Sequence, residues 1–581
     1  MSVFLKLTWF FRQEWRRYSL AVIALIGVGG ATMIPPWVIG KIVDAIADGS
    51  LTKTSLQQQV FIILGAALFS YGLRVLWRIA LFGASYTLAN QLRQTIFAHL
   101  TLQAPEFFDR LKTGDLMARA TNDIQAVEMT AGEAVLALFD GAFTGLLVLI
   151  MMTVFISWPL TIIALGPWPI VGFFMWRYGK QLHQSFKDAQ ARFSDLNDSV
   201  QESISALRLT RAMGRETIEC EQFNNIAASA NEANQRVAKI DSKYDPTIQL
   251  GIGFSFFLSI AGGAYFIHQG ELTLGQLTSF TLYLGFMIWP MFAIGWLLNL
   301  VERGSAAYER IDQLLNSQPT IKDNGTQNQS IEPSLTFEIE QFSYPESQAS
   351  VLKDIEFQVP SGSLVGIVGP VGAGKSTLLH LLMRMQQVPM SAITLGGVDI
   401  NDLTLNNLRR HIAVVPQTPF LFSMTIAQNI ALAKPSATMQ EIESVAKIAQ
   451  VHEDILGFPQ GYLTEVGERG VTLSGGQKQR LAIARALILD APVLVLDDAL
   501  SAVDIKTEQQ ILSHLKQARQ GKTTLVVCHR LSAVEQANHV IVMESGRIIE
   551  QGQHRELIQQ QGWYAKTYDY QQLEHVVEEG R

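Results

Sequence analysis

Hydrophobic and polar positions divide the chain into two parts with different patterns. Apolar stretches long enough to cross a bilayer, about 20 residues each, occur only in the first three hundred positions. They cover 18–43, 59–83, 134–157, 160–179, 248–268 and 276–300, and the third and fourth meet at Trp158 and Pro159. The pattern therefore predicts six membrane-spanning helices.

Basic residues are distributed unevenly among the segments that connect these stretches. In the three short connections, 42–59, 157–160 and 268–275, Lys53 is the only Lys or Arg. The two long connections are rich in Lys and Arg, with four in 84–133 and nine in 180–247. Because basic residues stay on the cytoplasmic side of a membrane, we place both long connections and both termini in the cytoplasm.

The two long connections are polar and have helical periodicity. We expect them to continue the spanning helices out of the membrane and to turn back near 113–123 and 207–216. Such protruding ends can transmit the movement of a cytoplasmic domain. The alternative is that they are solvated loops.

The N-terminal segment 1–17 differs from the spans that follow. Residues 4–16 are amphipathic and predict a helix on the membrane surface, with an extension of the first span as the alternative. Arg12, Arg16 and Arg17 follow its apolar part and no small-residue cleavage motif is present, so this segment does not resemble a removable signal.

The membrane part, 18–320, ends at a polar stretch. Residues 321–335 include Gly and Pro and predict a linker. From 336 to 581 the pattern changes to alternating short apolar strands and helices. Such alternation is typical of an α/β domain with a largely parallel sheet.

Composition agrees with a chain that is partly embedded in a membrane. Only 17% of the 581 residues are charged, and the formal net charge is −7. This balance argues against a nucleic-acid partner. Cys220 and Cys528 are far apart in segments that we place in the cytoplasm, so neither a disulfide nor a cysteine metal site is expected.

A glycine-rich loop lies between an apolar strand, 364–368, and an apolar helix that begins after it. Strand, loop and helix in this order are the setting in which G-x-x-x-x-G-K-[ST] binds a nucleotide phosphate. Backbone N–H groups surround the phosphate at the helix N-terminus, Lys375 reaches the β- and γ-phosphates, and the Ser376 hydroxyl binds Mg²⁺. The residues that we assign to ATP binding here are Gly369, Pro370, Val371, Gly372, Ala373, Gly374, Lys375, Ser376 and Thr377.

A second loop of this kind precedes the helix 478–486. Its residues Ser474, Gly475, Gly476 and Gln477 offer backbone donors at a helix N-terminus. One nucleotide needs only one such loop in its own domain. We therefore expect a head-to-tail pair of domains in which each second loop closes over the other domain's nucleotide; the alternative is an ordinary N-capped helix.

Polar residues at the ends of other apolar strands complete the predicted site. Asp497 ends a buried strand and is expected to hold Mg²⁺, together with Ser376 and Gln417. Asp498 is placed to orient and deprotonate the attacking water. Three further residues belong to this prediction: His529 at the γ-phosphate, Asp504 in the loop after the acids, and Tyr344 stacked on adenine.

In their order and spacing, these motifs resemble an ATP-binding cassette (ABC) domain. The matching segments are Phe342–Pro345 (A-loop), Gly369–Thr377 (Walker A), Gln417 (Q-loop), Leu473–Gln477 (signature), Leu496–Asp498 (Walker B), Ser501–Asp504 (D-loop) and His529 (switch histidine). Phe107–Arg110, Gln201–Ile204 and Gly270–Gln276 extend the resemblance into the membrane half.

The chain as a whole is similar to exporters with fused membrane and nucleotide domains, above all the bacterial Mdl-type multidrug-resistance-like half-transporters. The resemblance implies an α-helical membrane domain joined to an α/β P-loop NTPase cassette. It also implies ATP and Mg²⁺ as cofactors, a second half-transporter as partner, and a multi-pass location in the cytoplasmic (inner) membrane.

One position departs from the family pattern. Asp498 occupies the place of the usual catalytic glutamate. Aspartate is one methylene shorter, and a misplacement of about 1 Å can cost 10²-fold in rate. Beside an intact Leu473–Gln477 segment, this weakened base predicts a heterodimer whose partner supplies a glutamate. The alternative is a tolerated variant that hydrolyses ATP slowly.

Charged and aromatic residues also occur within the predicted spans. Arg74 and Arg78 share a face of the second span and Asp140 lies in the third, so an ion pair between Asp140 and an arginine is one hypothesis. Such a pair can be structural or can contact a substrate. Candidate lining residues of an apolar cavity are Trp77, Phe139, Phe143, Phe254, Phe257, Trp289, Phe292 and Trp296.

The sequence thus predicts one half of an ATP-driven exporter of hydrophobic or amphipathic compounds. The alternatives are a homodimeric lipid or peptide exporter and an ATP-gated channel or sensor that does not pump. A soluble cassette protein is excluded by the six predicted spans.

Overall fold

The computed structural model describes residues 2–579, apart from 329, 346, 348 and 468–472. The chain forms two compact units. The membrane unit consists of residues 1–99 and 114–316, and the C-terminal unit consists of residues 100–113 and 317–581.

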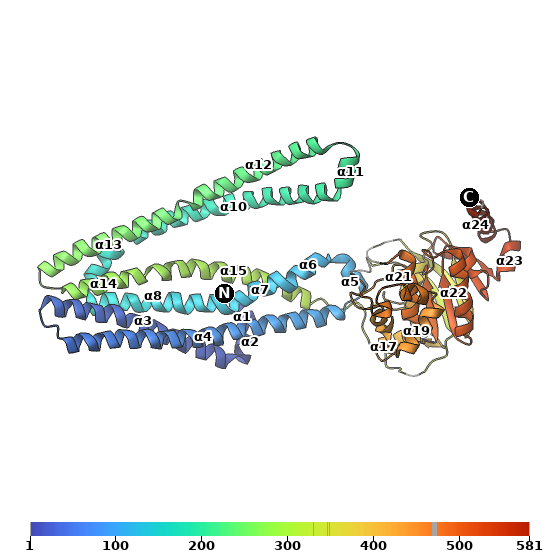
Figure 1. Cartoon of the computed structure of the whole chain (residues 1–581), viewed down its shortest axis with the longest axis horizontal. Helices are drawn as coiled ribbons and strands as arrows, with labels where there is room; N and C mark the ends of the chain where they lie inside the picture. Colours follow the sequence, from blue (N-terminus) through green and yellow to red (C-terminus); the bar gives the residue numbers. More distant parts are fainter. Residues whose placement is uncertain (1, 329, 346, 348, 468–472, 580–581) are drawn as a thin grey trace. The chain divides into compact units, whose positions relative to one another are not determined.

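Six long helices that are apolar enough to cross a membrane make up most of the membrane unit, which confirms the predicted number (Figure 1). Their elements are α3 (Trp15–Ala47), α4 (Lys53–Thr101), α6 to η4 (Thr113–Ile156), α9 and α10 (Trp158–Leu165, Trp168–Ser205), α12 and α13 (Glu216–Asp241, Tyr244–His268), and α14 and α15 (Leu274–Phe286, Ile288–Leu315).

The spanning helices continue well beyond their apolar stretches. In Figure 1, α12 lies along α10, and the short α11 (Leu207–Ala212) joins them at the far end. Arg236 forms an ion pair with Asp188 at 2.6 Å across α10 and α12. The long connections are therefore helical hairpins rather than solvated loops.

The first long connection reverses direction earlier than the expected 113–123. Its turn holds α5 (Pro105–Arg110), while residues 113–118 already form the helix α6. The physical reason is Pro105, because a residue that precedes proline avoids the helical conformation. Ala104 accordingly has an extended backbone, with ψ at 157°. Gly114, within the range where the turn was expected, lies in the first turn of α6.

The N-terminal segment forms two short helices, α1 (Ser2–Lys6) and α2 (Thr8–Gln13), rather than one continuous helix. Val3, Leu7 and Phe10 are fully buried, whereas Leu5 is 78% exposed. The segment is therefore amphipathic, with one apolar face packed against the membrane unit.

The third spanning helix has an irregular backbone. It alternates α-helical turns, α7 (Ile124–Met129) and α8 (Thr144–Ile150), with π-helical turns. The latter are η1 (Arg119–Asp123), η2 (Thr130–Ala134), η3 (Ala137–Phe143) and η4 (Met151–Ile156). π-Helical turns are rare and are frequently found at functional sites.

The C-terminal unit contains two sheets. The six-stranded sheet has the order β10-β9-β3-β8-β7-β6, and all its neighbouring strands are parallel except β10 and β9. Its strands are β3 (Leu364–Val368), β6 (Ile412–Val415), β7 (Val493–Asp497), β8 (Thr523–Val527), β9 (His539–Glu544) and β10 (Arg547–Gly552). This agrees with the predicted largely parallel sheet.

The second sheet is antiparallel and has the order β2-β1-β4-β5. Its strands are β1 (Leu335–Phe342), β2 (Leu352–Val359), β4 (Ile393–Leu395) and β5 (Val398–Asp399). Besides α5, the α-helices among the described residues of this unit are α16 (Lys375–Leu382), α17 (Leu405–His411), α18 (Ile426–Ile430), α19 (Met439–Ile448), α20 (His452–Leu456), α21 (Gly475–Leu487), α22 (Ile505–Ala518), α23 (His554–Gln559) and α24 (Trp563–Glu579).

The core of this unit sits on both faces of the parallel sheet. All five residues of β8 are buried, as are the last four of β3 and the first four of β7. Such continuous apolar strands are typical of a parallel sheet that is covered on both sides. The loops that follow β3, β6, β7 and β8 consequently meet at one edge of the sheet, where ligands bind in open α/β folds.

Candidate nucleotide-binding site

The glycine-rich loop connects the end of β3 to the start of α16, as the sequence predicts. Gly369 has φ at 147°, and a Cβ atom built on it would lie 2.0 Å from the carbonyl oxygen of Met543. Gly374, at the N-cap of α16, has φ at 97°. Only glycine fits these two positions without strain. The loop can therefore curl tightly in front of the helix N-terminus.

Lys375 folds back over this loop. Its Nζ donates to the carbonyl oxygens of Gly369 at 2.8 Å and of Pro370 at 2.9 Å, and the side chain is buried. Burial lowers the pKa of this ammonium group, while the charges of Asp498 and Asp497 oppose that shift. The two carbonyl oxygens thus hold the ammonium group at the loop, in a position suited to phosphate oxygens.

A cavity of about 280 Å³ brings most of the predicted residues together. It is lined by Val351, Val371, Gly372, Ala373, Gly374, Lys375, Ser376, Thr377, Gln417, Asp497, Asp498, Val527 and His529. Val351 precedes β2, residues 371–377 follow β3, Gln417 follows β6, and the remaining residues lie at the carboxyl ends of β7 and β8 or directly after them. Their assigned roles remain predictions, but their convergence follows from the parallel sheet.

Tyr344 lies beside the loop rather than among the lining residues. Its hydroxyl shares a hydrogen bond with the Thr377 Oγ1 at 3.0 Å, and its ring packs edge-on against Phe342. The ring is therefore held close to the start of α16, where an adenine base attached to a phosphate in the loop can reach it.

Two adjacent carboxylates end β7. Burial raises the pKa of Asp497, and the neighbouring charge of Asp498 raises it further. The hydroxyl of Ser376, the amide of Gln417 and the carboxylate of Asp497 supply oxygen ligands, which are the kind that Mg²⁺ prefers. This donor set therefore fits a magnesium ion bound together with a nucleotide.

The backbone of Asp498 is held from both sides. Its N–H donates to the Val527 carbonyl at 2.7 Å, and its own carbonyl accepts from the Ser501 hydroxyl at 2.9 Å. Its φ of 46° lies in the left-handed region, which is uncommon for aspartate. Because the main chain is anchored, the reach of the carboxylate is set by side-chain length.

The second loop does not belong to this cavity. Ser474 and Gln477 form a capping box at the start of α21, with bonds of 3.0 and 3.3 Å, and neither lines the cavity. The residues 468–472 that precede Leu473 lie outside the described residues. The backbone donors of α21 are thus separate from the nucleotide cradle of the same chain.

One residue that sequence reasoning missed joins the second loop to the loop after β7. The Gln479 Nε2 donates to the Ser501 Oγ at 3.0 Å, and its Oε1 accepts from the Ala502 N–H at 2.9 Å. Gln479 is buried. The available signal is a glutamine on the apolar face of α21, where a buried amide requires partners.

Asp504 caps α22 instead of lining the cavity. Its carboxylate accepts from the Thr507 N–H at 2.9 Å, and this bond lowers the pKa of Asp504. Nearby, the Arg530 Nη1 donates to the Val503 carbonyl at 2.9 Å and pairs with the fully buried Glu508 at 3.3 Å. These contacts, which sequence reasoning also missed, tie the residue after His529 to the loop after β7.

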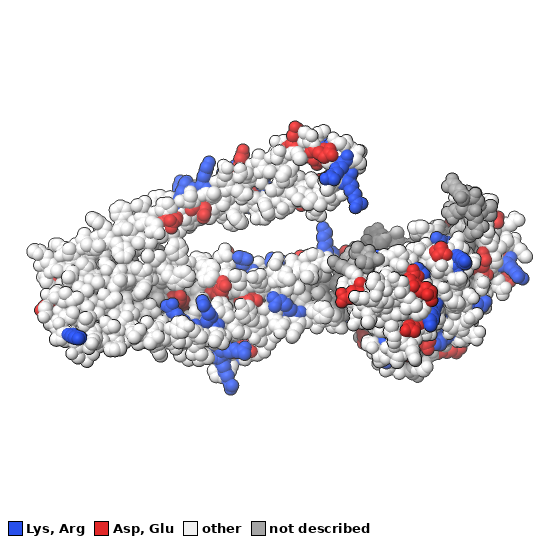
Figure 2. Space-filling model, viewed as in Figure 1, with Lys and Arg blue, Asp and Glu red and all other residues white. Residues whose placement is uncertain are grey.

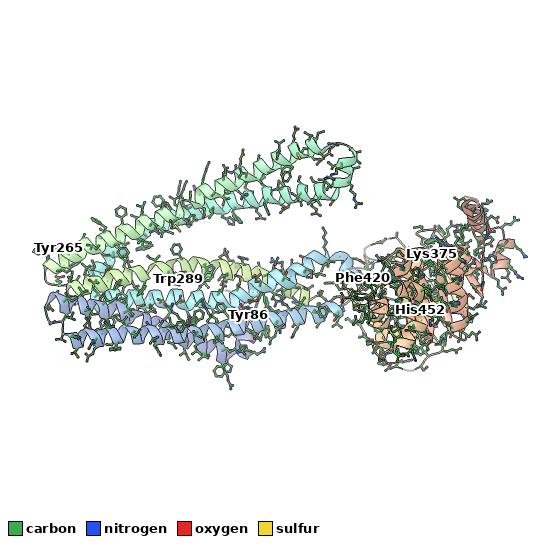
Figure 3. All side chains as sticks on the ribbon, in the orientation of Figure 1. Tyr86, Tyr265, Trp289, Lys375, Phe420 and His452 are labelled. Atoms are coloured by element: carbon green, nitrogen blue, oxygen red, sulfur yellow. The ribbon has the colours of Figure 1, made fainter. Side chains whose placement is uncertain are left out.

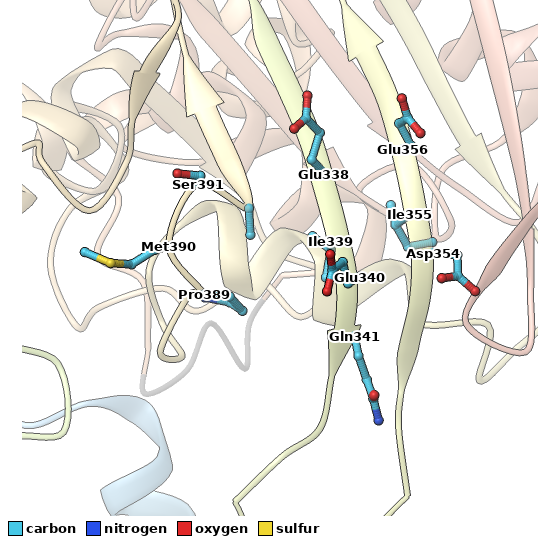
Figure 4. Close-up of a pocket in the computed structure, with 11 residues that line it drawn as sticks. Glu338, Ile339, Glu340, Gln341, Asp354, Ile355, Glu356, Pro389, Met390 and Ser391 are labelled. Carbon is cyan, nitrogen blue, oxygen red and sulfur yellow. The ribbon is translucent and has the colours of Figure 1, made fainter.

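A larger groove of about 750 Å³ lies on the antiparallel sheet, away from the predicted residues. Figure 4 shows four carboxylates along β1 and β2, those of Glu338, Glu340, Asp354 and Glu356. Asp354 pairs with Arg547 at 3.2 Å. An acidic surface repels phosphate, so this groove does not compete with the cavity as a nucleotide site.

In the membrane unit, Asp140 has a different partner from the arginines that we considered. Its Oδ2 accepts a hydrogen bond from the Trp289 Nε1 at 2.9 Å. Arg78 lies over the ring of Trp77, with 5.8 Å to the centroid. No ion pair joins Asp140 to Arg74 or Arg78 within the described part of the chain.

The candidate aromatic residues of the membrane unit differ in their surroundings. Trp77 is buried, whereas Trp289, Phe292 and Trp296 are exposed along α15. Phe254 lines an apolar cavity of about 600 Å³ between α10 and α13. Phe254 is the one candidate among the described residues that line this cavity.

Comparisons with known proteins agree with this architecture. Residues 18–291 match the model of the ABC transporter transmembrane region, and residues 352–501 match that of the ABC transporter family. The multidrug resistance-like ATP-binding protein MdlA of Escherichia coli (strain K12) is 48% identical over 579 residues, covering 100% of this chain and 98% of that protein.

Two further relatives span almost the whole chain. The ATP-dependent lipid A-core flippase of Chromohalobacter salexigens is 32% identical and covers 98% of both chains. The structure of a bacterial Atm1-family ABC exporter with ATP bound superposes with a TM-score of 0.76 at 27% identity, covering 96% of this chain and 98% of that one. Fused membrane and cassette regions and the full-length similarity to MdlA thus place the chain in the ABC transporter family, as an ATP-hydrolysing, multidrug-resistance-like exporter.

Proposed function

We propose that this chain is one half of a heterodimeric exporter that uses ATP to move hydrophobic and amphipathic compounds out across the cytoplasmic membrane. Two chains bring their cassettes together and hold ATP and Mg²⁺ at the interface. The observation that carries the proposal is the separation of the two phosphate-facing loops: Lys375 lines the cavity and Ser474 does not.

The position of the second loop supports a site shared between chains. The 13-residue helix α21 begins at Gly475, and its first N–H groups form a site of positive partial charge. Those donors lie outside the cavity of their own chain. A nucleotide in the partner's cradle would give them a phosphate to bind, and the partner's corresponding loop would complete the cavity described here.

The residue Asp498 supports an unequal pair of sites. Its backbone is held by Val527 and Ser501, so the shorter side chain cannot be compensated by a shift of the main chain. A base displaced by about 1 Å loses about 10²-fold in rate. We therefore assign most hydrolysis to the partner's site, which would use the partner's glutamate and this chain's Ser474 loop.

The first cytoplasmic turn supports mechanical coupling to the cassette. Residues 100–113 belong to the same compact unit as the cassette, and the Gln103 Nε2 donates to the Ser317 carbonyl at 3.3 Å. Closing the cassettes on ATP would move α5 and, through α4, the membrane helices. In this scheme the turn 102–112 and the turn at α11 are the coupling elements.

The test is ATPase activity of the chain reconstituted with its partner half-transporter in proteoliposomes. Asp498→Ala should reduce the rate by less than about 2-fold, and the glutamine variant of the partner's catalytic glutamate should reduce it by about 100-fold or more. Wild-type activity of this chain purified alone, lost fully on Asp498→Ala, would overturn the heterodimer.

A lipid is a second candidate substrate, because a relative that is named a lipid A-core flippase matches nearly the full chain at 32% identity. Stimulation of the ATPase by a lipopolysaccharide core lipid, with none by hydrophobic drug-like compounds, would favour this candidate. Stimulation by several unrelated amphipathic compounds would favour the first.

A further inference from the structure

The last helix of the chain, α24, contacts the main chain beside His529. The Gln571 Nε2 donates to the His529 carbonyl oxygen at 2.9 Å, and the Gln571 Oε1 accepts from the Leu531 N–H at 2.9 Å. A glutamine amide carries both donors and an acceptor, so one side chain satisfies two backbone groups of the loop after β8. Two such bonds fix the orientation of the loop as well as its position.

One face of α24 packs onto the C-terminal unit and places Gln571. Tyr564 is fully buried, and its hydroxyl shares a hydrogen bond with the His554 Nδ1 at 2.8 Å. The ring of Tyr568, one turn later, lies edge-on to the His554 ring, with 5.0 Å between the centroids. Tyr564, Tyr568 and Gln571 follow the i, i+4, i+7 spacing of a single helical face, whereas Tyr570 is 67% exposed. The packing of this face therefore brings the Gln571 amide to the loop.

Gln571 lies outside the nucleotide cavity, because it is not among the described residues that line it. In Figure 1, α24 lies at the margin of the C-terminal unit, and Figure 3 labels Lys375 of the cradle among the packed side chains. Acidic and basic side chains are interspersed on the visible face of this unit (Figure 2), so local contacts rather than a field of one sign hold the helix there. The route from α24 to a nucleotide thus runs through the loop that it holds.

The same loop is anchored from a second side. The Ser532 Oγ donates to the buried Glu508 carboxylate at 2.9 Å, and Arg530 pairs with that carboxylate at 3.3 Å. Among these contacts, the one made to His529 itself is that of Gln571. The imidazole of His529 lines the cavity, so its reach depends on how firmly the main chain behind it is held.

We propose that Gln571 is a positioning residue for His529, so that hydrolysis in this chain's own cradle depends on the docking of α24. With the amide in place, the loop holds the imidazole in the cavity; without it, the loop can shift. A misplacement of about 1 Å can cost 10²-fold in rate. The inference rests on the proposed function, because it requires ATP in the cradle and His529 at the γ-phosphate.

The experiment is single-turnover hydrolysis of bound ATP by the full chain, assembled with its partner in nanodiscs. The catalytic glutamate of the partner is changed to glutamine, and Asp498→Glu gives this chain the usual glutamate, so the rate reports this chain's own site. In this parent pair, Gln571→Met keeps the length and packing of the side chain but loses both hydrogen bonds. It should slow hydrolysis by about 10-fold or more.

Two controls separate positioning from loss of structure. Gln572→Met makes the same change at the next, exposed position of α24 and should hydrolyse ATP like the parent. The affinity for TNP-ADP, which has no γ-phosphate, should change by less than about 2-fold in Gln571→Met, because the group it positions acts on the reacting phosphate. A matching loss of ADP affinity would give Gln571 a merely structural role and overturn the inference.

A double-mutant cycle tests the route through His529. In a His529→Ala background, Gln571→Met should slow hydrolysis no further, because the group that it positions is already absent. Additive effects, or a parental rate in Gln571→Met beside a slow His529→Ala, overturn the inference alone. Unchanged hydrolysis in His529→Ala overturns the assigned role of His529 as well. The export proposal fails separately, if ATP drives no accumulation of any amphipathic compound in inverted vesicles while Gln571→Met still slows hydrolysis.

Discussion

The loops that open α16 and α21 are built alike and placed differently. Both direct backbone N–H groups from a helix N-terminus, but only the first lines the cavity with Asp498 and His529. The first loop is closed by its own Lys375, whereas Ser474 and Gln477 bond to one another at the start of α21 and Gln477 also donates to Asp454 at 3.0 Å. The difference supports our proposal that one chain holds a nucleotide cradle, the loop before α16, and separately a clamp, the loop Ser474–Gln477.

The largest expected effect comes from a charge in the clamp. Gly475→Asp places a carboxylate in the first turn of α21, where it favours the helix but repels a γ-phosphate. ATPase activity of the reconstituted pair should fall by about 10²- to 10³-fold, because the carboxylate keeps the γ-phosphate of the partner's nucleotide away from these donors.

Its matched control is Gly475→Asn, which has the same shape without the charge and should retain far more activity. A Cβ atom at Gly475 meets only the Ala502 Cβ at 3.5 Å, so both side chains can be accommodated. Equal activity of the two variants would remove the clamp from the account.

A smaller effect is expected beside the cradle. Tyr344→Ala removes the proposed adenine platform and should weaken ATP binding to this chain by about 10-fold, whereas Tyr344→Phe keeps the ring and loses only the bond to Thr377. Photolabelling with an azido-ATP would measure both. An alanine variant that labels like the wild type would show that adenine binds elsewhere.

The smallest effect concerns stability. Asp497 has a pKa raised by burial and by Asp498, so the folded state binds its proton more tightly than the unfolded state does. Its charged form is therefore destabilising, and that cost appears as pH rises through the unfolded and then the folded pKa. Asp497→Asn should raise the Tm of the nucleotide-free chain by a few degrees at neutral pH.

Thermal unfolding of the full chain in excess EDTA is the appropriate measurement. The gain of Asp497→Asn should shrink as pH falls, because the wild-type carboxyl then becomes protonated. In the presence of Mg²⁺ and ATP the variant should lose its advantage, because it lacks the carboxylate that the metal requires. A pH-independent gain would contradict the role of burial.

Much of this architecture can be predicted from the sequence because its signals are local. Span length identifies the six helices, and apolar strands that end in polar residues place Gln417, Asp497 and His529 at one sheet edge. The turn at Pro105 was expected later, near 113–123, where residues 113–118 instead form α6. Proline, which restricts the preceding residue, determines the outcome.

Contacts between distant segments are harder to predict. Asp140 and Trp289 are 149 positions apart, and they meet because Gly141 and Gly145 let α15 approach. In the same way, the Gln479 amide finds its partners only once α21 packs against the loop after β7. Neither pairing has a spacing or composition signature, because each depends on how whole helices pack.

Cross-linking between this chain and its partner tests the central claim most directly. A Ser474→Cys variant, with the exposed Cys220 replaced, is paired with a cysteine in the phosphate-binding loop of the partner. The account predicts a disulfide between the chains that ATP-driven closure accelerates in a hydrolysis-deficient pair. If ATP leaves Ser474 unlinked to that loop, the clamp does not serve the partner's nucleotide, and the account is contradicted.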